Sequence, residues 1–374
     1  MRQGRINRLR RLGAGLAALA GAASLSACGG GAAGDAGQAA AKAPSDIVCA
    51  RQGRLAASGS TAQQNAMKHW MREYQQACPG VQIRYVALGS GGGVAQFLRG
   101  ATVLAGTDSA LKPDEVEASR QTCPGGRAID LPMVGGPIAV GYNVDGVDDL
   151  VLDAATLARI FDSEISTWDD PEIQRLNPGV ELPATPISAV HRSDGSGTTQ
   201  NFNAYLGAAA PEEWPYGAEK AWQAKGGHSA AGSDGVASQV YTTDGAIGYL
   251  ELSSAAAEGI ATVRLDTGAP EPVAVSAKAA SAGIAAAEVG AGGGKDLTVE
   301  FDYATDAPGA YPLVQVTYEV VCDRGTPAEV LPALKSFLTY TAGEEGQNHL
   351  AKLHYAPLPP ALAARVRDVV ASLS

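Results

Sequence analysis

Residues 192–198 carry the groups in this sequence that are best suited to chemistry. The stretch reads RSDGSGT, follows an apolar run at 187–190 that predicts a short strand, and leads into a predicted helix. The first turn of a helix has free N–H groups and the positive end of the dipole, both of which favour an anion. Arg192 adds a guanidinium fork that Asp194 is close enough to hold, and Ser196 and Thr198 add hydroxyls. We therefore predict an anion-binding loop; a simple helix cap at Ser196 or Thr198 is the alternative.

Three earlier segments repeat the same order of strand, glycine- or serine-rich loop and helix. Their loops lie at 58–61, 89–93 and 107–109, and Ser60 or Thr61 is the predicted N-cap of the helix that buries positions 67, 70, 71 and 74. The repetition predicts an α/β fold with helices flanking a largely parallel sheet. Because ligands in such folds lie at the carboxyl ends of strands, the four loops can converge on one site.

The rest of the chain supplies the elements that hold these loops. The 374 residues are enough for two domains. A long apolar segment, 129–143, predicts a strand that crosses from one domain to the other, and 254–300 is weakly patterned. Further predicted elements are helices at 153–161, 328–338, 343–353 and 361–373 and a strand at 311–321.

The N-terminus has the pattern of an export signal. Five arginines in the first 11 residues precede an apolar stretch, 12–23, which is too short to span a bilayer as a mature helix. The segment ends in Leu25-Ser26-Ala27-Cys28, which resembles the bacterial lipobox. That resemblance implies a signal peptide at 1–27, lipidation of Cys28, and an exported protein lipid-anchored on the outer face of the bacterial cytoplasmic membrane, at the cell surface or in the periplasm. A plain secretory signal is the alternative. Residues 28–46 read as a flexible linker.

Charge and cysteine content exclude several classes of protein. Without residues 1–27 the chain has 23 basic and 39 acidic residues, a net charge of −16, so it is a poor nucleic-acid binder and any anion site must rely on local donors. Apart from Cys28, four cysteines in an exported chain favour two disulfides. Three pairings are possible, and we favour Cys78–Cys123 with Cys49–Cys322. There is no CxxC, and the five histidines are scattered, so no metal or cofactor is predicted.

Short motifs follow one another along the chain from about residue 55 to the C-terminus. They are GST at 59–61, GSGGGV at 89–94, TDSAL at 107–111, LD at 152–153, IF at 160–161, TWDD at 167–170, RSDGSGT at 192–198, GAIGY at 245–249 and YAPLP at 355–359. In this order they resemble the PstS family, the phosphate-binding subunits of phosphate ABC transporters.

The resemblance implies a fold, a function and partners. The expected fold is a two-domain periplasmic-binding-protein fold of type II, with domain I at 47–140 and 310–374, domain II at 141–309, and the ligand in the cleft between them. The expected function is high-affinity extracytoplasmic binding of inorganic phosphate and its delivery to the permease and ATPase subunits of an ABC transporter. The chain is then not an enzyme and needs no cofactor.

The resemblance also implies a set of phosphate ligands. Ser60, Thr61, Ser90 and Asp108 belong to the first domain, and Arg192, oriented by Asp194, belongs to the second. Ala62 contributes a backbone N–H, and Ser196, Gly197 and Thr198 donate from the helix start. The chain departs from the commonest family pattern at Ala62, often an aromatic residue, and at Gly91, often a serine.

Asp108 is the residue that predicts the kind of anion. A carboxylate beside a bound dianion is repulsive unless a proton lies between them, and hydrogen phosphate has such a proton whereas sulfate at neutral pH has none. A buried acceptor without a donor costs about 1–3 kcal/mol, so phosphate is favoured over sulfate. A helix cap is the alternative role for Asp108.

Three other functions stay open at this point. A phosphatase-like relative that hydrolyses phosphate esters would need a nucleophile with a base or paired metals, and His191, the histidine beside the hydroxyl-rich loops, is expected to face away from Arg192. A receptor for another oxyanion, such as sulfate or molybdate, is disfavoured by Asp108. An added role in signalling or as a surface antigen is compatible with the sequence.

Overall fold

The computed structural model describes residues 47–285, 287–289 and 294–374. The predicted signal peptide, the linker at 28–46 and the lipidation site Cys28 lie outside these residues. Within the described part of the chain, none of the helices has the length and apolar character needed to cross a membrane.

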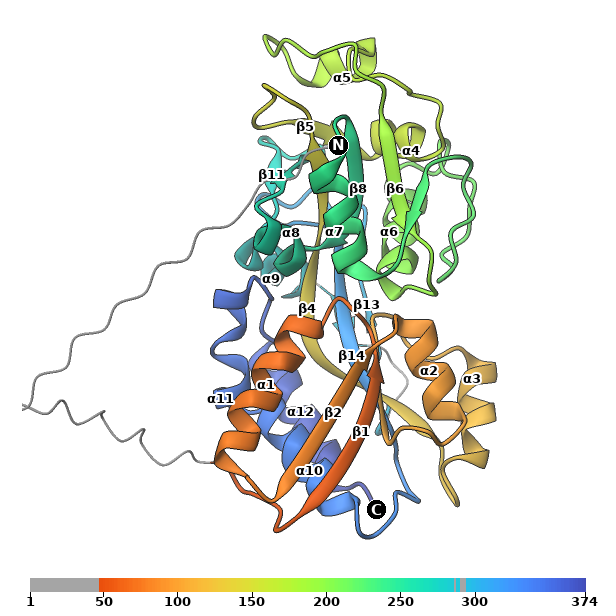
Figure 1. Ribbon diagram of the computed structural model, residues 1–374, viewed down its shortest axis with the longest axis vertical. Helices are drawn as coiled ribbons and strands as arrows, with labels where there is room; N and C mark the ends of the chain where they lie inside the picture. The colour runs from red at the N-terminus through yellow and green to blue at the C-terminus, as the bar shows by residue number, and fades with distance from the viewer. Residues whose placement is uncertain (1–46, 286, 290–293) are drawn as a thin grey trace, which may run out of the picture. The chain divides into compact units, whose positions relative to one another are not determined.

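A mixed nine-stranded sheet forms the centre of the described part of the chain (Figure 1). Its strand order is β2-β1-β3-β14-β4-β8-β6-β7, with β9 paired to β4. The strands are β1 (Gly53–Gly59), β2 (Val81–Ala87), β3 (Leu104–Thr107), β4 (Ala128–Asn143), β6 (Ser188–Arg192), β7 (His228–Ala230), β8 (Ala246–Glu251), β9 (Ala261–Thr262) and β14 (Val314–Cys322). Two small sheets comprise β5 (Val151–Asp153), β10 (Arg264–Asp266) and β11 (Val273–Ala274), and β12 (Glu288–Val289) with β13 (Val299–Glu300).

Helices cover this sheet on both faces. They are α1 (Gln64–Ala77), α2 (Ser90–Leu98), α3 (Pro113–Ala118), α4 (Ala154–Phe161), α5 (Pro171–Leu176), α6 (Gly197–Ala209), α7 (Gly232–Thr242), α8 (Leu252–Glu258), α9 (Ala277–Ala285), α10 (Leu331–Thr341), α11 (Glu344–Gln347) and α12 (Pro360–Ala371). Two 3₁₀ turns lie at Ser119–Gln121 and Leu350–Leu353. The predicted strand at 129–143 and the predicted helices at 153–161 and 361–373 are thus confirmed within a residue or two.

The centre of the sheet is antiparallel, which corrects the expectation of a largely parallel sheet. Strand β1 runs parallel to β2 and β3, and β6 runs parallel to β7 and β8. Strand β14, however, is antiparallel to both β3 and β4, and β4 is antiparallel to β8. The reason is connectivity: the chain leaves one group of elements along β4 and returns along β14, so the two strands must run in opposite directions (Figure 1).

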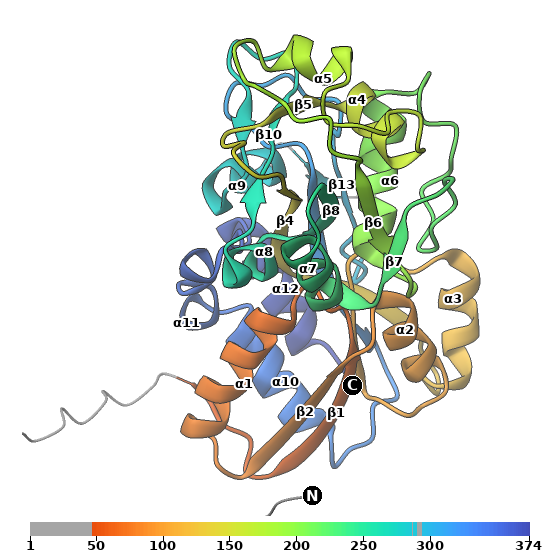
Figure 2. The same ribbon diagram turned by 45° about the horizontal axis from the view of Figure 1, so that its top comes forward.

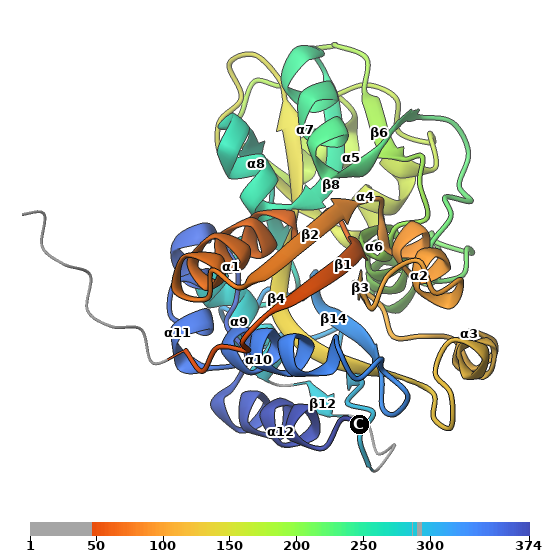
Figure 3. The ribbon, with the colours of Figure 1, turned by 60° about the horizontal axis from the view of Figure 1, so that its bottom comes forward.

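Two large apolar cores lie at the two ends of this pair of strands. In what we call the first lobe (β1–β3, α1–α3, α10–α12), Trp70 and Tyr74 of α1 are fully buried, and the Tyr74 ring meets Phe337 of α10 with centroids 5.3 Å apart. The first-lobe helices α1, α10 and α12 pack on one face of the sheet and α2 on the other (Figure 3). The amphipathic face predicted for α1 is therefore confirmed.

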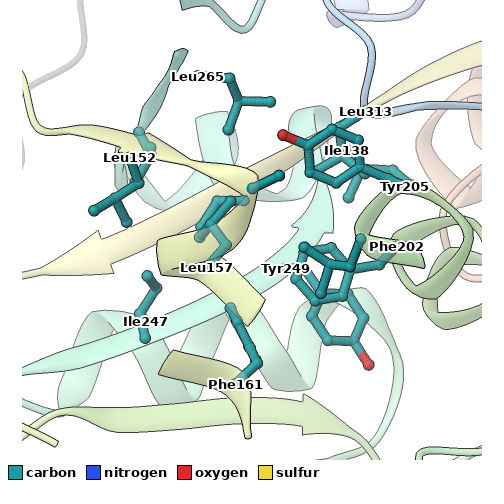
Figure 4. Packing of buried hydrophobic residues seen from close by; sticks show 14 of the residues in the cluster. Ile138, Leu152, Leu157, Phe161, Phe202, Tyr205, Ile247, Tyr249, Leu265 and Leu313 are labelled. Atoms are coloured by element: carbon teal, nitrogen blue, oxygen red, sulfur yellow. The ribbon is translucent and has the colours of Figure 1, made fainter. Parts of the chain in front are cut away.

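The second lobe (β5–β11, α4–α9) has its own core. Phe161 of α4 packs edge-on against Phe202 of α6, and Phe202 stacks on Tyr249 of β8 with ring centroids 4.3 Å apart (Figure 4). These contacts anchor the helix that follows the RSDGSGT loop. By their contacts the described residues between 47 and 374 form one compact unit, and the predicted domain boundaries, at 140/141 and 309/310, stay predictions.

The predicted helix at 343–353 is broken. Helix α11 ends at Gln347, and a 3₁₀ turn follows at Leu350–Leu353. The carbonyl of Gly346 accepts a 2.7 Å hydrogen bond from the indole N–H of Trp70. This carbonyl therefore binds a side chain of α1 and does not form the next hydrogen bond of an α-helix.

The described residues form two disulfides, but both predicted pairings, Cys78–Cys123 and Cys49–Cys322, are wrong. Cys49 pairs with Cys78, and Cys123 pairs with Cys322, with Cα–Cα distances of 5.4 and 5.3 Å. Helix α1 returns the chain to the start of β1, which brings Cys78 beside Cys49. Strand β14 ends beside the start of β4, where Cys322 is in register with Ala128, so Cys322 meets Cys123.

Candidate anion-binding site

The four predicted loops meet between the two lobes. They follow β1, β2, β3 and β6. The stretch predicted as a loop at 89–93 is already helical from Ser90, the first residue of α2, and the stretch at 192–198 becomes helical at Gly197, the first residue of α6; the ends of these two helices lie close together (Figure 2). The Gly91 N–H donates to the Gly195 carbonyl at 2.8 Å, and the Gly197 N–H donates to Ser90 Oγ at 3.1 Å. The N-termini of α2 and α6 thus face each other at one place in the molecule.

The loop after β1 contributes Ser60, Thr61 and Ala62. Ser60 Oγ accepts the Ala62 N–H at 3.0 Å, and Thr61 Oγ1 accepts the N–H of Ser233, from the second lobe, at 3.1 Å. The expectation that Ser60 or Thr61 caps α1 is wrong: the N-cap is Gln63, without a side-chain cap bond, because both hydroxyls are used elsewhere. The Ala62 N–H is likewise bonded within the loop, so its role as an anion donor stays a prediction.

Asp108, which follows β3, is the carboxylate of the site. It is 3% exposed, its Oδ1 accepts from Thr317 Oγ1 at 2.7 Å, and its Oδ2 accepts from Ser90 Oγ at 3.1 Å. Burial raises the pKa of Asp108 above its ordinary value, although the hydroxyls of Ser60 and Thr317 and the charge of Arg192 oppose the rise. A more basic carboxylate is a stronger acceptor for a ligand hydroxyl.

Arg192 ends β6 and is 2% exposed. Its Nε and Nη2 donate to Oδ1 and Oδ2 of Asp194 at 2.8 and 2.5 Å, which leaves Nη1 outside this pair. Burial by itself would raise the pKa of Asp194. The hydrogen bonds and the charge of Arg192, together with the hydrogen bond from the Gly232 N–H, outweigh burial and hold this pKa below its ordinary value. The carboxylate is therefore ionised and fixes the plane of the guanidinium.

The start of α6 supplies the remaining donors. Ser196 is the N-cap, and its Oγ accepts the Thr199 N–H at 3.1 Å, so the cap predicted as the alternative role of Ser196 is present. Thr198 is fully buried, and its hydroxyl has no hydrogen-bond partner among the described residues. A buried hydroxyl of this kind needs a partner, which a bound anion would provide.

Several residues that hold these groups in place are not among those predicted from the sequence. Thr317 of β14 fixes Asp108, and Ser233 of α7 contacts Thr61. The Tyr249 hydroxyl accepts the Arg192 N–H at 3.2 Å, and the Asn201 amide donates to the carbonyls of Asp108 and Gly197. The polar alternation of β14, QVTYE, was a usable signal for Thr317, since one face of this strand is polar in an otherwise apolar run.

The ring of His191, which precedes Arg192 in β6, contacts the Arg192 carbonyl oxygen through Nδ1 at 3.1 Å. The same ring stacks on Trp222 with centroids 5.0 Å apart, and burial lowers the pKa of His191. Among the described residues, no group of three or more histidine, cysteine, aspartate or glutamate side chains is placed to hold a metal ion. The site therefore combines hydroxyls, helix N-termini and one held guanidinium with one buried acceptor, an arrangement suited to a tetrahedral oxyanion that carries a proton.

Comparisons with known proteins show the family and the fold of the chain. A family model described as the PBP superfamily domain matches residues 35–345. The chain is 42% identical over 364 residues to phosphate-binding protein PstS 3 of Mycobacterium leprae, covering 96% of this chain and 98% of that protein. It is 40% identical over 331 residues to PstS 2 of Mycobacterium tuberculosis, covering 87% and 89%.

The chain belongs to the PstS family. Solved structures of phosphate-binding proteins share the fold. PfluDING, a periplasmic phosphate-binding protein solved with phosphate, gives a TM-score of 0.69 at 22% identity and covers 85% of this chain and 93% of its own. A phosphate-binding protein from Stenotrophomonas maltophilia gives 0.64 at 20% identity, covering 84% and 93%. The predicted family and the two-domain α/β fold of this PstS member are confirmed, while its ligand set stays a prediction.

Proposed function

We propose that this chain binds inorganic phosphate outside the bacterial cytoplasm and delivers it to a membrane ABC permease. Its relatives carry the name of phosphate-binding proteins, and none of those named above is described as an enzyme. The proposed ligands are the hydroxyl and N–H groups of the four loops, Arg192 and Asp108.

The observation that carries this proposal is the position of Asp108. It is buried, it accepts from Thr317 and Ser90, and the charge of Arg192 reaches it. A ligand placed among the surrounding donors must still supply one proton to this carboxylate. Hydrogen phosphate can do so, whereas sulfate leaves two negative groups in contact.

Closure of the two lobes on the ligand follows from the same contacts. Arg192 and α6 belong to the second lobe, and Ser90 and Asp108 to the first, so an anion bound to both favours the closed arrangement. The lobes also meet at Lys112–Glu219, 2.6 Å apart, on the surface. Lipid attachment at Cys28 would keep the protein beside its permease and ATPase partners.

The test is isothermal titration of the purified protein with phosphate and then with sulfate at pH 7. We expect one-to-one phosphate binding and no sulfate response. Binding of both anions would keep the site and discard the role of Asp108. Binding of neither would contradict the proposal, and hydrolysis of phosphate esters would then be measured.

A further inference from the structure

One face of β14 carries buried polar side chains behind the anion site. Gln315, Thr317 and Glu319 alternate along the strand, so their side chains point to the same face. All three are at most 2% exposed. Thr317 holds Asp108 by the 2.7 Å hydrogen bond. Anion binding as proposed above uses neither Gln315 nor Glu319.

Glu319 lies in a closed polar environment at one end of this face. It is in register with Gly106 of β3, where an added Cβ would come within 1.9 Å of Gln63 Nε2 and 2.6 Å of the Tyr85 hydroxyl. Both carboxyl oxygens of Glu319 lack a hydrogen-bond partner among the described residues. Burial raises the pKa of Glu319 to about 8; the nearby Gln63 amide opposes this rise, and the charge of Asp108 adds to it.

Glu251, the last residue of β8, lies at the other end. An added Cβ on Gly136 would be 3.1 Å from Gln315 Nε2 and 3.5 Å from Glu251 Cγ, so these two side chains meet over that glycine. Glu251 Oε2 accepts from the Ser253 N–H at 2.9 Å, but its Oε1 and both amide atoms of Gln315 have no partner within the described chain. Burial raises the pKa of Glu251 to about 8 against the hydrogen bonds from Ser253 and Tyr355, and the charge of Asp108 adds to the rise.

Asp108, Glu251 and Glu319 are thus three buried carboxyl groups, and both glutamates are close enough for the charge of Asp108 to act on them. The titratable groups that face Glu319 are Tyr85 and Asp108, and those that face Glu251 are Tyr355 and Asp108. The positive charge that reaches Asp108 is that of Arg192, which Asp194 already balances. Three ionised carboxylates here would oppose both each other and a bound anion, and a buried acid without a charged partner takes up a proton instead.

We propose that Glu251 and Glu319 work as neutral, proton-carrying carboxyl groups behind the anion site, which makes anion binding proton-linked. The coupling rests on the proposed binding of phosphate. Ionisation of either group places a negative charge behind Asp108 and weakens binding. By reciprocity, a bound anion raises the proton affinity of both groups. Phosphate binding therefore takes up protons at pH values at which the free protein has partly lost them.

The test is the phosphate dissociation constant between pH 8 and 9.5, where phosphate in solution stays the dianion. For the wild type we expect the constant to rise with pH, by up to about tenfold per unit for each ionising group. E319Q and E251Q, which mimic the protonated acids, should each flatten this rise. The control E258Q changes an exposed glutamate on α8 and should keep the wild-type profile. Wild-type slopes in both E319Q and E251Q would overturn the proposal.

Two further measurements separate the parts of the proposal. Titration at pH 8.5 in buffers of different ionisation enthalpy should show fewer protons taken up per phosphate by E319Q than by the wild type. Infrared spectra at pH 7 should show a protonated-carboxyl band that is reduced in each variant, and a wild type without this band overturns the proposal whether or not phosphate binds. If the wild type binds no phosphate at pH 7, the proposed function fails and the coupling with it, while the infrared band still reports the protons.

Discussion

The Gly197 N–H donates to Ser90 Oγ at 3.1 Å across 107 residues of sequence. This hydrogen bond joins the first turn of α2 in the first lobe to the first turn of α6 in the second lobe. Both turns present the positive ends of helix dipoles. The same Ser90 hydroxyl contacts Asp108, so one side chain links the donors of the site to its acceptor.

Replacement of Arg192 by alanine should weaken phosphate binding strongly. The guanidinium is buried and held by Asp194, and truncating one partner of a buried charged pair costs about 2–5 kcal/mol, a loss of roughly 30-fold or more in affinity. Isothermal titration measures the effect. The matched control is Arg264→Ala, whose partner Asp149 is 64% exposed. Equal affinities of the two variants would show that the proposed site is wrong.

Replacement of Asp108 by asparagine should relax the rejection of sulfate. The neutral amide removes the repulsion of a second anion and can donate a hydrogen bond, so the ratio of the sulfate to the phosphate dissociation constant should fall by about tenfold or more. Asp306→Asn, at an exposed position, should leave the ratio unchanged. An unaltered ratio in Asp108→Asn would remove the argument that Asp108 accepts the ligand proton.

Replacement of Gly89 by alanine should separate Asp194 from the start of α2. Gly89 has φ +78°, and an added Cβ would be 2.0 Å from Asp194 Oδ2. Asp194 must then move, so it no longer holds the guanidinium of Arg192 in its plane. Phosphate should therefore bind about tenfold more weakly or worse. Gly100→Ala is the control, because its φ is +68° while its Cβ would meet no atom closer than 4.0 Å. Equal phosphate affinities of Gly89→Ala and Gly100→Ala in isothermal titration would contradict this prediction.

The free energy of unfolding should fall as the pH rises through the range in which Glu251 and Glu319 are protonated in the folded chain but ionised in the unfolded chain. Their pKa values are raised from 4.5 to about 8, so the folded chain binds more protons than the unfolded chain between these values. The free energy of unfolding then decreases by about 1.4 kcal/mol per pH unit for each group and levels off above about pH 8. Denaturant unfolding at pH 5.5, 7 and 8.5 measures this slope.

The double variant E251Q/E319Q should have a shallower slope than the wild type over the same pH range. Other titrating groups, including Asp130, whose pKa burial also raises to about 8, contribute equally to both proteins. Identical slopes would mean that neither glutamate holds a proton specifically in the folded state. The exposed variant E258Q serves again as the control.

Local features of the site could be predicted because they depend on neighbours in sequence. The RSDGSGT stretch follows a strand and precedes a helix, as its apolar spacing indicates, and Ser196 is the cap that such a sequence favours. The buried face of α1 follows equally from its 3.6-residue period. The N-cap of α1 could not be predicted, because the Thr61 hydroxyl accepts a hydrogen bond from the N–H of Ser233, which is 172 residues away in the sequence.

The sequence by itself determined the α/β class, the four loops and the identity of the groups that they carry, since hydrogen-bonding side chains and helix starts are local properties. Only the tertiary structure decided the antiparallel centre of the sheet, the disulfide pairing, and the contact of Thr317 with Asp108. It also decided that the polar face of β14 is buried instead of solvent-exposed. Alternation along a strand shows which residues share a face, but only the packing of other elements decides whether water reaches that face.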